Sequence, residues 1–555
     1  MLASLRRVAA EREKVLRMAT QPSTKEDLIK QDIKRLHGLG YAQELFREMG
    51  GFSNFAISFT IISILTGGVS TFGFGLLYAG PLAASVGWLF VSIMVLFVGL
   101  AMAELASAYP TAGGLYYWAS KLRGPGWGWY TGWFNLIGQV AVTASIDFLL
   151  SILFLEWLSV KVTSLPAPGT LQFAELSLGV YAVILAVHST MNIYGIRLVA
   201  LLNDISVWWH IAGVLLVVGA LFFFAPHHSN TLSFLFHGSD SLSVVGVAPL
   251  FGLLLGLLLA QYTLTGYDAS AHVSEETVGA NRRAPWGIVM SIVVSAVAGY
   301  VLMIGLAIAI PDKAPAGSTA ASGLDYVAQQ GTNAVQTILS SGLGGDAAFV
   351  IFGLILVAQF FCGMSSVTSN SRMIYAFSRD GAVPGSKIWH RLNRRRIPAN
   401  AVLLAAGAAF VLAIPYLFNS VAYYAVVSIS VVAIYIAYVL PTLVRLLSPD
   451  FKQGTWNLGR FSKLVGWIAV IWVAFISVLF LLPQLYPVTR DNFNYAPVVV
   501  LGSLVLLTIW WLVSQRRVFK GPIIQGDEAT LEQLEAKIEA ESIYHEPGVA
   551  VPSKR

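Results

Sequence analysis

The chain has 555 residues, of which 56% are hydrophobic and 12% are charged, and its formal net charge is +6. Soluble domains carry roughly 25% charged residues, so this composition and a mean hydropathy of +0.69 exclude a soluble protein and predict a polytopic membrane protein. The single cysteine, Cys362, excludes an internal disulfide and a cysteine metal cluster. We expect neither a cofactor nor a resident metal.

Twelve apolar segments of about 20 residues follow one another along the chain, which is the length that crosses a bilayer as a helix. Their predicted bounds are 54–78, 82–108, 127–156, 175–196, 203–224, 246–270, 287–310, 347–371, 400–417, 420–444, 464–484 and 496–514.

Two segments outside these spans carry predictions of their own. Residues 311–346, rich in Ala, Gly and Ser, are expected to form an extracellular loop. Thr530 and Gln533 predict a capping box that starts a short amphipathic helix in the C-terminal tail. That helix could bind a partner, lie on the membrane or be solvated.

The basic residues predict an orientation. If both termini are cytoplasmic, only Lys161, Lys313 and Arg490 of the 35 Lys and Arg residues fall in outside loops. This asymmetry is what the positive-inside rule requires. We therefore expect a multi-pass protein of a plasma or inner membrane with both termini in the cytoplasm. The basic residues are dispersed over several loops, so a nucleic-acid partner is not expected.

The first and sixth spans both carry an interruption. The first contains adjacent glycines, Gly67 and Gly68, in the run SILTGGVSTFG (63–73), and the sixth contains QYTLTGYD (261–268). Glycine costs roughly 1 kcal/mol relative to Ala in a helix, so the pair serves either close helix packing or a break. Two interrupted helices in matching positions predict the binding site of a transporter, because unwound backbone exposes N–H donors and carbonyl acceptors.

Ionisable side chains inside a membrane are costly and by default mark function. Glu104, Asp147, His210 and Asp268 fall within the predicted spans. A direct contact of Asp147 with a substrate amine is one possibility. Because a histidine titrates near pH 6.5, His210 either exchanges a proton in each cycle or stays neutral and hydrogen-bonds a neighbouring helix.

Four motifs resemble one known family. They are MAELASAYPTAGGLYYW (102–118), MNIYGIRLVALLND (191–204), TGYDASAHVSEETVGANRRAPWGI (265–288) and SNSRMIYAFSRDGAVPGSKIWHRLNRRRIPANAV (369–402). Over roughly residues 40–515 the chain resembles permeases of the amino acid–polyamine–organocation (APC) superfamily. The last motif resembles the amino acid/choline transporter branch, which includes GABA and choline permeases.

The resemblance implies an all-α membrane fold of about 12 transmembrane helices, with a LeuT-like 5+5 inverted repeat and two additional helices. The implied divisions are an N-terminal tail (1–50), the repeats (51–225 and 246–445), two further spans (464–514) and a C-terminal tail (515–555).

A substrate site between spans 1, 3, 6 and 8 is also implied by the resemblance. Backbone N–H groups of span 1 would bind a carboxylate, carbonyls near Leu65 and Leu264 would take the amine, and Tyr262 would act as an aromatic gate. The implied substrate-binding residues are Leu65, Thr66, Gly67, Gly68, Val69, Tyr262, Leu264, Thr265, Gly266, Tyr267 and Asp268.

The coupling ion is open between two predictions. Some relatives place a lysine in span 5 at the spacing at which His210 stands here, so His210 could couple transport to protons. Alternatively, span 8 hydroxyls could help hold sodium, although such hydroxyls commonly bond their own backbone. The hydroxyls concerned are those of Ser365, Ser366, Thr368 and Ser369. Exchange or facilitated diffusion, without a coupling ion, is also compatible with the sequence.

Charged residues in the cytoplasmic loops are predicted either to gate the inner side or to anchor the topology. Glu275 and Glu276 share a loop with Arg282 and Arg283. Glu104 either pairs with one of the loop arginines or faces the surface. The other charged loop carries Arg372, Arg379 and Asp380, and the expected gate residues are Glu104, Glu275, Glu276 and Arg372.

Together these patterns predict a secondary active transporter in a lipid bilayer, moving an amino acid or GABA-like zwitterion by alternating access with proton coupling. A choline or polyamine permease and an amino-acid exchanger are alternatives within the same class. A nutrient sensor that keeps the transporter fold is the alternative from another class. Since the sequence offers no nucleophile–base motif, an enzyme is not expected.

Overall fold

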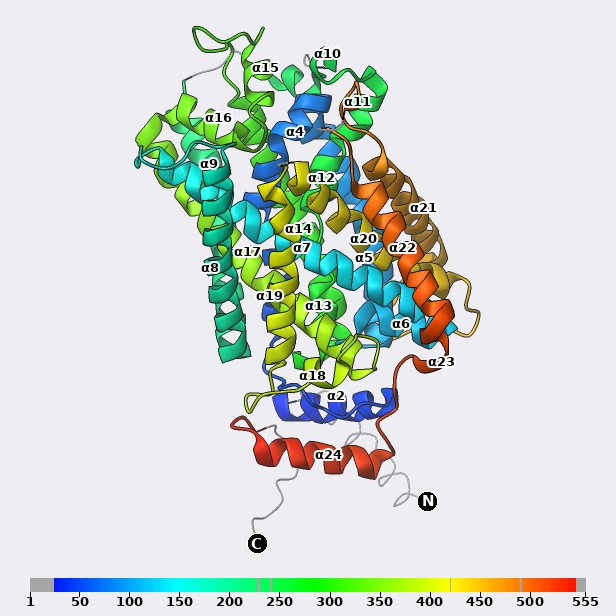
Figure 1. Cartoon of the computed structure of the whole chain (residues 1–555). Coiled ribbons are helices and arrows are strands. Elements are labelled where there is room, and N and C mark those ends of the chain that lie inside the picture. Colours follow the sequence, from blue (N-terminus) through cyan, green and yellow to red (C-terminus); the bar gives the residue numbers. More distant parts are fainter. Residues whose placement is uncertain (1–23, 227–229, 240–241, 420, 490–491, 546–555) are drawn as a thin grey trace, which may run out of the picture.

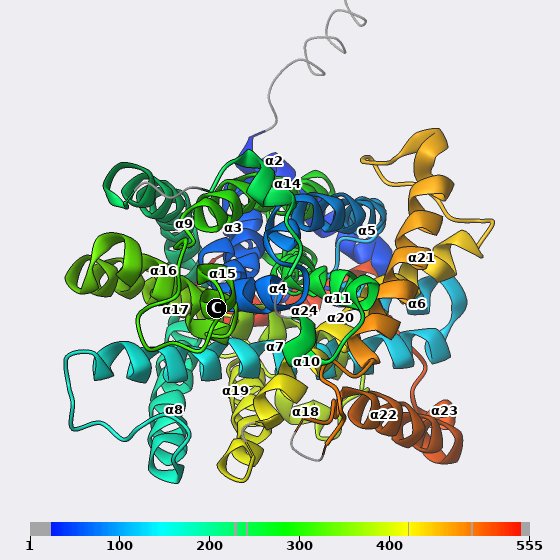
Figure 2. The same ribbon diagram turned by 90° about the horizontal axis from the view of Figure 1, so that it is seen from above.

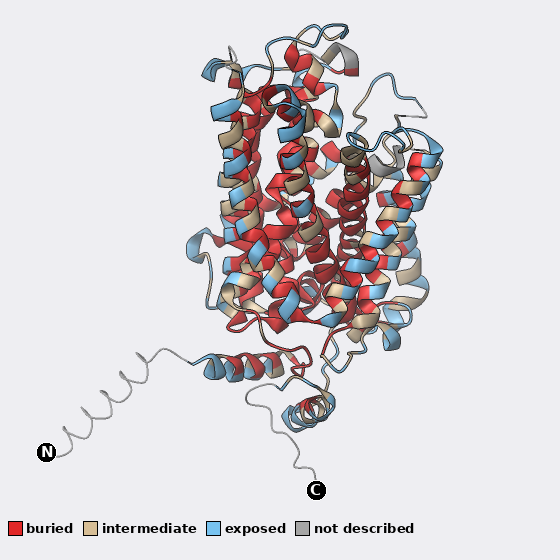
Figure 3. Cartoon of the chain, turned by 90° about the vertical axis from the view of Figure 1, so that its left-hand side faces the viewer, coloured by how far each residue is buried: buried red, intermediate tan, exposed pale blue. Residues whose placement is uncertain are grey.

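A computed structural model describes residues 24–226, 230–239, 242–419, 421–489 and 492–545. Within these residues the regular structure is helical, and strand-like pairing is limited to one isolated bridge between Met49 and Thr277. The long helices form a single bundle in which buried residues concentrate in the middle and exposed residues lie on the outward faces (Figure 3). The all-α membrane fold predicted from the sequence is confirmed.

Eleven helical segments of the described chain are long and apolar enough to cross a membrane. They correspond to eleven of the twelve predicted spans. In chain order they are α3–η1–α4 (Gly51–Ala79), η2–α5 (Ala83–Ala108), α7 (Pro125–Ser159), α8 (Leu171–Tyr194), α9 (Ile196–Phe224), α14 (Ala280–Ile308), α17 (Gly345–Arg379), α19–η6 (Ala399–Leu417), α20 (Val421–Leu446), η7–α21 (Gly459–Leu481) and α22–η8–α23 (Ala496–Val518).

The remaining predicted span, 246–270, is divided. It consists of α11 (Pro249–Gly256), α12 (Leu258–Thr263) and α13 (Ala269–His272), followed by the short turn η4 (Ser274–Glu276). A continuous helix would leave no exposed backbone there, so the division is the structural form of the interruption expected from the sequence.

Both ends of the described chain lie at one end of the bundle, which we call the terminal end (Figure 1). Two helices cross it, α2 (Lys25–Leu39) and α24 (Glu528–Glu541). The short helix α6 (Gly114–Arg123) also lies near this end. Residues 1–23 of the predicted N-terminal tail lie outside the described residues.

The capping box predicted for the C-terminal helix is wrong. The N-cap of α24 is Asp527, whose side chain accepts from the Thr530 backbone N–H at 3.0 Å, so the helix begins before Thr530. Asp527 can serve as the cap because an acid at the N-cap satisfies a free helical N–H as well as a hydroxyl does. The solvated alternative also fails, since Leu531, Glu535 and Glu539 are buried against the rest of the chain.

The other end of the bundle, which we call the opposite end, carries α10 (Leu242–Val245), α11 and α15 (Gly323–Ala328), gathered around α4 (Figure 2). The expectation of a plain loop over 311–346 is wrong, because this segment contains α15, η5 (Gly331–Asn333) and α16 (Ala334–Leu343). The prediction rested on the Ala, Gly and Ser content of the segment, but Val335, Ile338 and Leu339 form an apolar stripe at helical spacing within it.

Candidate functional site

The interruption of the first span lies at Ser63, upstream of the glycine pair. Helix α3 (Gly51–Ile62) ends there with Ser63 in the left-handed region (φ 43°), and a π-helical turn, η1 (Ile64–Gly68), leads into α4 (Val69–Ala79). A Cβ on Gly67 would lie 3.1 Å from Thr263 Cγ2, and one on Gly68 would lie 2.9 Å from Met303 Cε. The helix therefore breaks at Ser63, and the two glycines leave room for the side chains of Thr263 and Met303.

The interruption of the sixth span lies directly against the first. Helix α12 ends at Thr263, Gly266 has φ +100°, and α13 begins at Ala269. A Cβ on Gly266 would lie 2.2 Å from Ile61 Cγ2 of α3, so only glycine allows both this backbone conformation and this approach. The two unwound regions thus pack together in the interior of the bundle.

A cavity of about 30 Å³ lies between the two interruptions, which is room for water and not for an amino acid. Its wall includes four of the residues predicted to bind substrate. These are Thr66, Gly67, Tyr262 and Thr265. The other predicted residues, Leu65, Gly68, Val69, Leu264, Gly266, Tyr267 and Asp268, do not line it. Polar lining residues that were not predicted to bind substrate are Ser63, Ser70, Ser145, Thr263, Gln359, Cys362 and Ser430.

The hydroxyls around this cavity donate to their own helices. Ser70 donates to the Gly67 carbonyl at 3.1 Å, Ser145 to the Val142 carbonyl at 3.0 Å, and Thr265 to the Gln261 carbonyl at 3.0 Å. A hydroxyl whose proton is used in this way keeps acceptor lone pairs, and an ammonium group offers donors. The cavity wall is therefore suited to an amine.

The backbone donors predicted to bind a carboxylate are engaged in this structure. The N–H groups of Thr66 and Gly67 both donate to the Ser63 carbonyl, at 2.9 and 2.8 Å. Since each backbone N–H has one proton to donate, a carboxylate can reach these donors only if the turn releases Ser63.

Two tyrosines of α20 satisfy the unwound backbone of the sixth span. Tyr435 donates to the Leu264 carbonyl at 2.8 Å, and the Gly266 N–H donates to the Tyr438 oxygen at 3.2 Å. Tyr438 in turn donates to Asp268 Oδ1 at 2.6 Å. Asp268 consequently faces α20 and α7 and not the cavity. No local pattern marks these tyrosines, because their contacts join segments about 170 residues apart.

His210 is hydrogen-bonded to the point at which the first span breaks. Its Nε2 lies 2.8 Å from Ser63 Oγ, and its Nδ1 lies 2.8 Å from the Ser206 carbonyl. A carbonyl only accepts, so Nδ1 carries the proton and Nε2 accepts from Ser63. Ser63 Oγ also lies 2.6 Å from Thr66 Oγ1 on the cavity wall. A proton added to Nε2 would force the Ser63 hydroxyl to turn.

A larger pocket of about 430 Å³ lies toward the opposite end, among α4, α12, α20 and residues 480–485 and 492–495. Ser70 and Tyr262 line both this pocket and the central cavity. These two side chains therefore form the boundary between them, which is where the resemblance places an aromatic gate at Tyr262.

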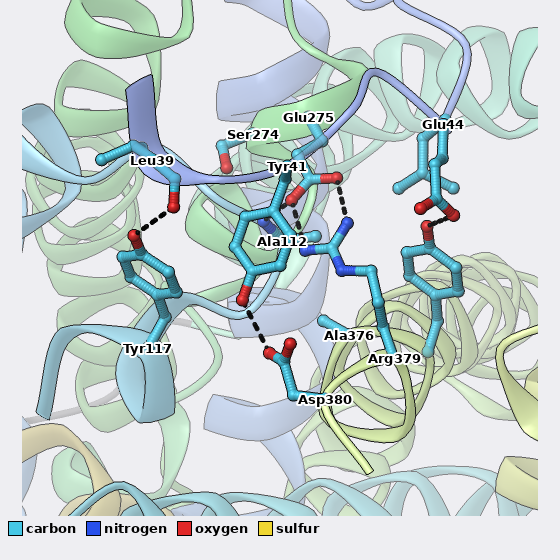
Figure 4. Close-up of polar contacts among 12 residues, drawn as sticks. Leu39, Tyr41, Glu44, Ala112, Tyr117, Ser274, Glu275, Ala376, Arg379 and Asp380 are labelled. Carbon is cyan, nitrogen blue, oxygen red and sulfur yellow. Dashed lines mark hydrogen bonds and ion pairs between the residues drawn. The ribbon is translucent and has the colours of Figure 1, made fainter. Parts of the chain in front are cut away.

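The terminal end is closed by buried ion pairs between the exit of the sixth span and α17. Arg372 lies 2.9 Å from Glu276. Arg379 forms two hydrogen bonds of 3.0 Å to Glu275, which Figure 4 shows. Glu275 also accepts from the Ala112 N–H at 2.9 Å. These buried pairs join the exit of the sixth span, α17 and the segment around Ala112 on the terminal side of the cavity.

The segment after α2 covers these ion pairs. The Arg379 guanidinium lies 3.9 Å from the ring centroid of Tyr41, and the Tyr41 hydroxyl donates to Asp380 at 2.7 Å (Figure 4). Tyr375 donates to Glu44 at 2.7 Å. Burial raises the pKa of Asp380 above its ordinary value, and hydrogen bonds from tyrosines and from the Ile523 N–H oppose that shift.

The C-terminal helix α24 lies under the same segment. Glu535 accepts from the Gln43 N–H at 2.6 Å and lies 2.7 Å from His37. Glu539 lies 3.3 Å from Arg396, whose guanidinium donates to the Gln43 carbonyl at 2.5 Å. Both tails are thus bonded to the closed terminal end.

Comparison with known proteins agrees with this architecture. The amino acid permease family model matches residues 49–504. The chain is 42% identical over 498 residues to the amino-acid permease BAT1 of Arabidopsis thaliana, which covers 88% of this chain and 96% of that relative. The chain belongs to the amino acid permease family of the APC superfamily. The GABA-specific permease of Saccharomyces cerevisiae is 31% identical over 506 residues, covering 88% of this chain and 86% of that relative.

The permease does not bring the four hydroxyls predicted for sodium to one point. Ser365 donates to Asn203 of α9 at 2.6 Å, Ser366 lies 2.9 Å from Thr143 of α7, and Thr368 donates to Asn192 of α8 at 2.6 Å. Successive helical residues point about 100° apart, so these side chains serve three different neighbours. The fourth residue, Ser369, is also fully buried.

Glu104 lies apart from the ion pairs of Glu275 and Glu276. It is buried and pairs with Arg445 of α20 at 2.7 Å, and it also accepts from Ser462. The surface-facing alternative and the pairing with a gate arginine are therefore both wrong. Of the two arginines in the acidic loop, Arg282 is exposed and Arg283 donates to the Val278 carbonyl at 2.9 Å.

Proposed function

We propose that this permease is a secondary transporter that moves an amino acid or a GABA-like zwitterion by alternating access. The observation that carries the proposal is the central cavity between two interrupted spans, closed on one side by buried ion pairs and bounded on the other by Tyr262. Such a cavity must open to each side in turn, because its present size excludes an amino acid.

The proposed orientation places the terminal end in the cytoplasm. The Lys and Arg distribution supports it, and so does the position of both described chain ends on one side of the bundle. We further propose that residues 51–225 and 246–445 are the two inverted repeats, each beginning with an interrupted span. The host membrane would be the plasma or bacterial inner membrane.

The hydroxyl lone pairs of Ser70, Ser145 and Thr265 are proposed to bind the substrate amine. The carboxylate is proposed to bind the N–H groups of Thr66 and Gly67 when the turn after Ser63 relaxes. One yeast relative is named for GABA, whose carboxylate and amine lie farther apart than those of an α-amino acid.

Proton coupling is proposed to act on the first span through His210, because its hydrogen bond to Ser63 joins a titratable group to the break. Sodium is the less supported ion, since the span 8 hydroxyls face three different helices.

Purified protein in liposomes tests the proposal. Uptake of labelled GABA and of α-amino acids is measured under imposed proton and sodium gradients, with choline and polyamines as competitors. We expect saturable uptake of a zwitterion, stimulated by an inward proton gradient and reduced by His210→Ala. Competition by choline alone, or sodium-driven uptake without a proton effect, would contradict the substrate or the coupling respectively.

A further inference from the structure

One face of α7 carries a polar residue at every turn through the interior of the bundle. Asn135, Gln139, Thr143 and Asp147 are each four residues apart, and all are buried. Residues at this spacing lie above one another on a helix. Buried polar groups inside a membrane are costly, so a continuous stripe of them requires an explanation.

The lower half of the stripe bonds to the exit of the sixth span. Asn135 Nδ2 lies 3.2 Å from His272 Nε2, and Gln139 donates to Asp268 Oδ2 at 2.7 Å. Asp268 and His272 form a pair of their own at 3.2 Å. His272 Nδ1 lies 3.0 Å from the carbonyl of Ala112, whose N–H donates to Glu275. This half of the stripe therefore ends at the closed gate.

The upper half bonds to α17 and α8. Thr143 Oγ1 lies 2.9 Å from Ser366 Oγ and accepts from Asn370 Nδ2 at 3.2 Å. Asp147 Oδ2 lies 3.1 Å from His188 Nδ1. The stripe thus joins two carboxylate–histidine pairs, and all four side chains of these pairs are fully buried.

The upper pair keeps one free position on each partner. Among the described residues, neither Asp147 Oδ1 nor His188 Nε2 has a hydrogen-bond partner. Space for the carboxylate depends on Gly363 of α17, since a Cβ there would lie 1.6 Å from Asp147 Oδ1 and 2.8 Å from His188 Cε1. An unpaired acceptor on each of two coupled titratable groups is a site for a proton.

We propose that this face of α7 is the proton pathway of the permease, with Asp147–His188 as its proton-binding site inside the membrane and Asp268–His272 as the station beside the gate. The proposal rests on the proton-driven transport proposed above. A proton bound at Asp147 Oδ1 or His188 Nε2 is released in the other half of the cycle and taken up by Asp268 or His272, so only O–H and N–H bonds form and break. Thr143 donates to the Gln139 carbonyl at 2.9 Å and holds this face of α7 in place.

The upper pair is placed to influence the substrate. Ser145 and Ile146, which adjoin Asp147 in the chain, both line the central cavity. The other titratable groups around the pair are Tyr181 of α8 and Cys362 of α17, while α19 carries none. The lower pair is faced by Tyr435 and Tyr438 of α20 and by Tyr267, which precedes Asp268 in the chain. Tyrosine and cysteine side chains ordinarily stay neutral near pH 7, so the two pairs, together with His210 at the break of the first span, are the groups proposed to exchange protons.

The test compares Asp147→Asn and His188→Gln with wild type in liposomes, using labelled GABA and α-amino acids. Both variants keep hydrogen-bonding capacity and lose titration at one partner. We expect proton-driven uptake to fall at least about tenfold, while exchange of internal for external substrate stays within about twofold of wild type. Should one variant fail to reach the membrane, the other carries the same test.

Ser151→Ala is the matched control, because Ser151 lies one turn beyond Asp147 on the same buried face and donates to its own helix at Phe148. It should change neither activity. Proton-driven uptake at the wild-type rate in both variants would overturn the pathway, as would equal loss of exchange and uptake, which indicates a structural role. Wild-type protein without any proton stimulation would instead contradict the proposed coupling itself.

Discussion

The two ends of the bundle are closed by different physical means. At the terminal end, Arg372–Glu276 and Arg379–Glu275 are buried ion pairs, and Tyr41 of the N-terminal tail stacks on Arg379. At the opposite end, the ion pair Lys161–Asp346 is largely exposed, and a pocket of about 430 Å³ reaches Tyr262. Exposed pairs contribute little, whereas separating a buried pair leaves two uncompensated charges.

Under the alternating access proposed above, this difference predicts which side of the permease opens more easily. Opening the terminal end requires the Arg372–Glu276 and Arg379–Glu275 pairs to separate. The N-terminal tail must move as well, because Tyr41 stacks on Arg379. Opening the opposite end requires Tyr262 and Ser70 to move apart. The structure therefore has buried ion pairs on the terminal side of the central cavity and a pocket of about 430 Å³ on its other side.

Breaking the terminal seal at one charge should have the largest effect. Arg372→Ala leaves Glu276 buried without its partner, so we expect a loss of about 3–5 kcal/mol of stability. Thermal unfolding of the purified protein in detergent measures it. The double variant Glu276→Gln/Arg372→Met removes both charges and should recover most of the loss. Equal destabilisation by the single and double variants would contradict the buried-charge explanation.

Filling the central cavity should have the next largest effect. Gly67→Val adds methyl groups beside Thr263 in a space of about 30 Å³, so uptake should fall at least about tenfold at unchanged expression. Gly219→Val on α9 is the control, since a Cβ there meets nothing within 4 Å. Normal uptake by Gly67→Val would show that the glycine serves only helix packing.

Loosening the tails should have a smaller effect on the terminal end. Glu535→Ala removes the acceptor for Gln43 and His37, which costs about 1–3 kcal/mol locally. Trypsin should then cut faster after the exposed Lys537 than in wild type. Glu532→Ala changes an exposed acid of the same helix and should leave the cleavage rate unchanged. Identical rates in all three proteins would mean that Glu535 does not hold α24.

The features that follow from local composition could be predicted from the sequence. Hydropathy located the membrane spans, although the predicted end at 371 lies eight residues before the end of α17 at Arg379. The polar run at 261–268 located the division of the sixth span. The glycine pair drew attention to the right turn but to the wrong residue, because the left-handed conformation falls on Ser63. A serine in that conformation is uncommon, so no local pattern indicates it.

The features that depend on distant contacts could not be predicted. Tyr435 and Tyr438 resemble ordinary apolar-face residues until α20 is placed beside α12. The partner of Glu104 is Arg445, and the partners of Glu535 lie in the other tail. These pairs join segments that lie at least 170 residues apart, and a single sequence carries no record of which segments meet.

Cys362 can report directly on the one-sided seal, because it is the only cysteine and lines the central cavity. A membrane-impermeant thiol reagent is applied to each side of reconstituted protein, and modification is followed by mass. A seal at the terminal end predicts that the reagent modifies Cys362 from the opposite end and that saturating substrate slows this reaction. Little modification is expected from the terminal end. The double variant Glu275→Gln/Arg379→Met should break the seal and allow modification from that end as well. Equal reaction from both sides in the wild type would contradict a one-sided seal.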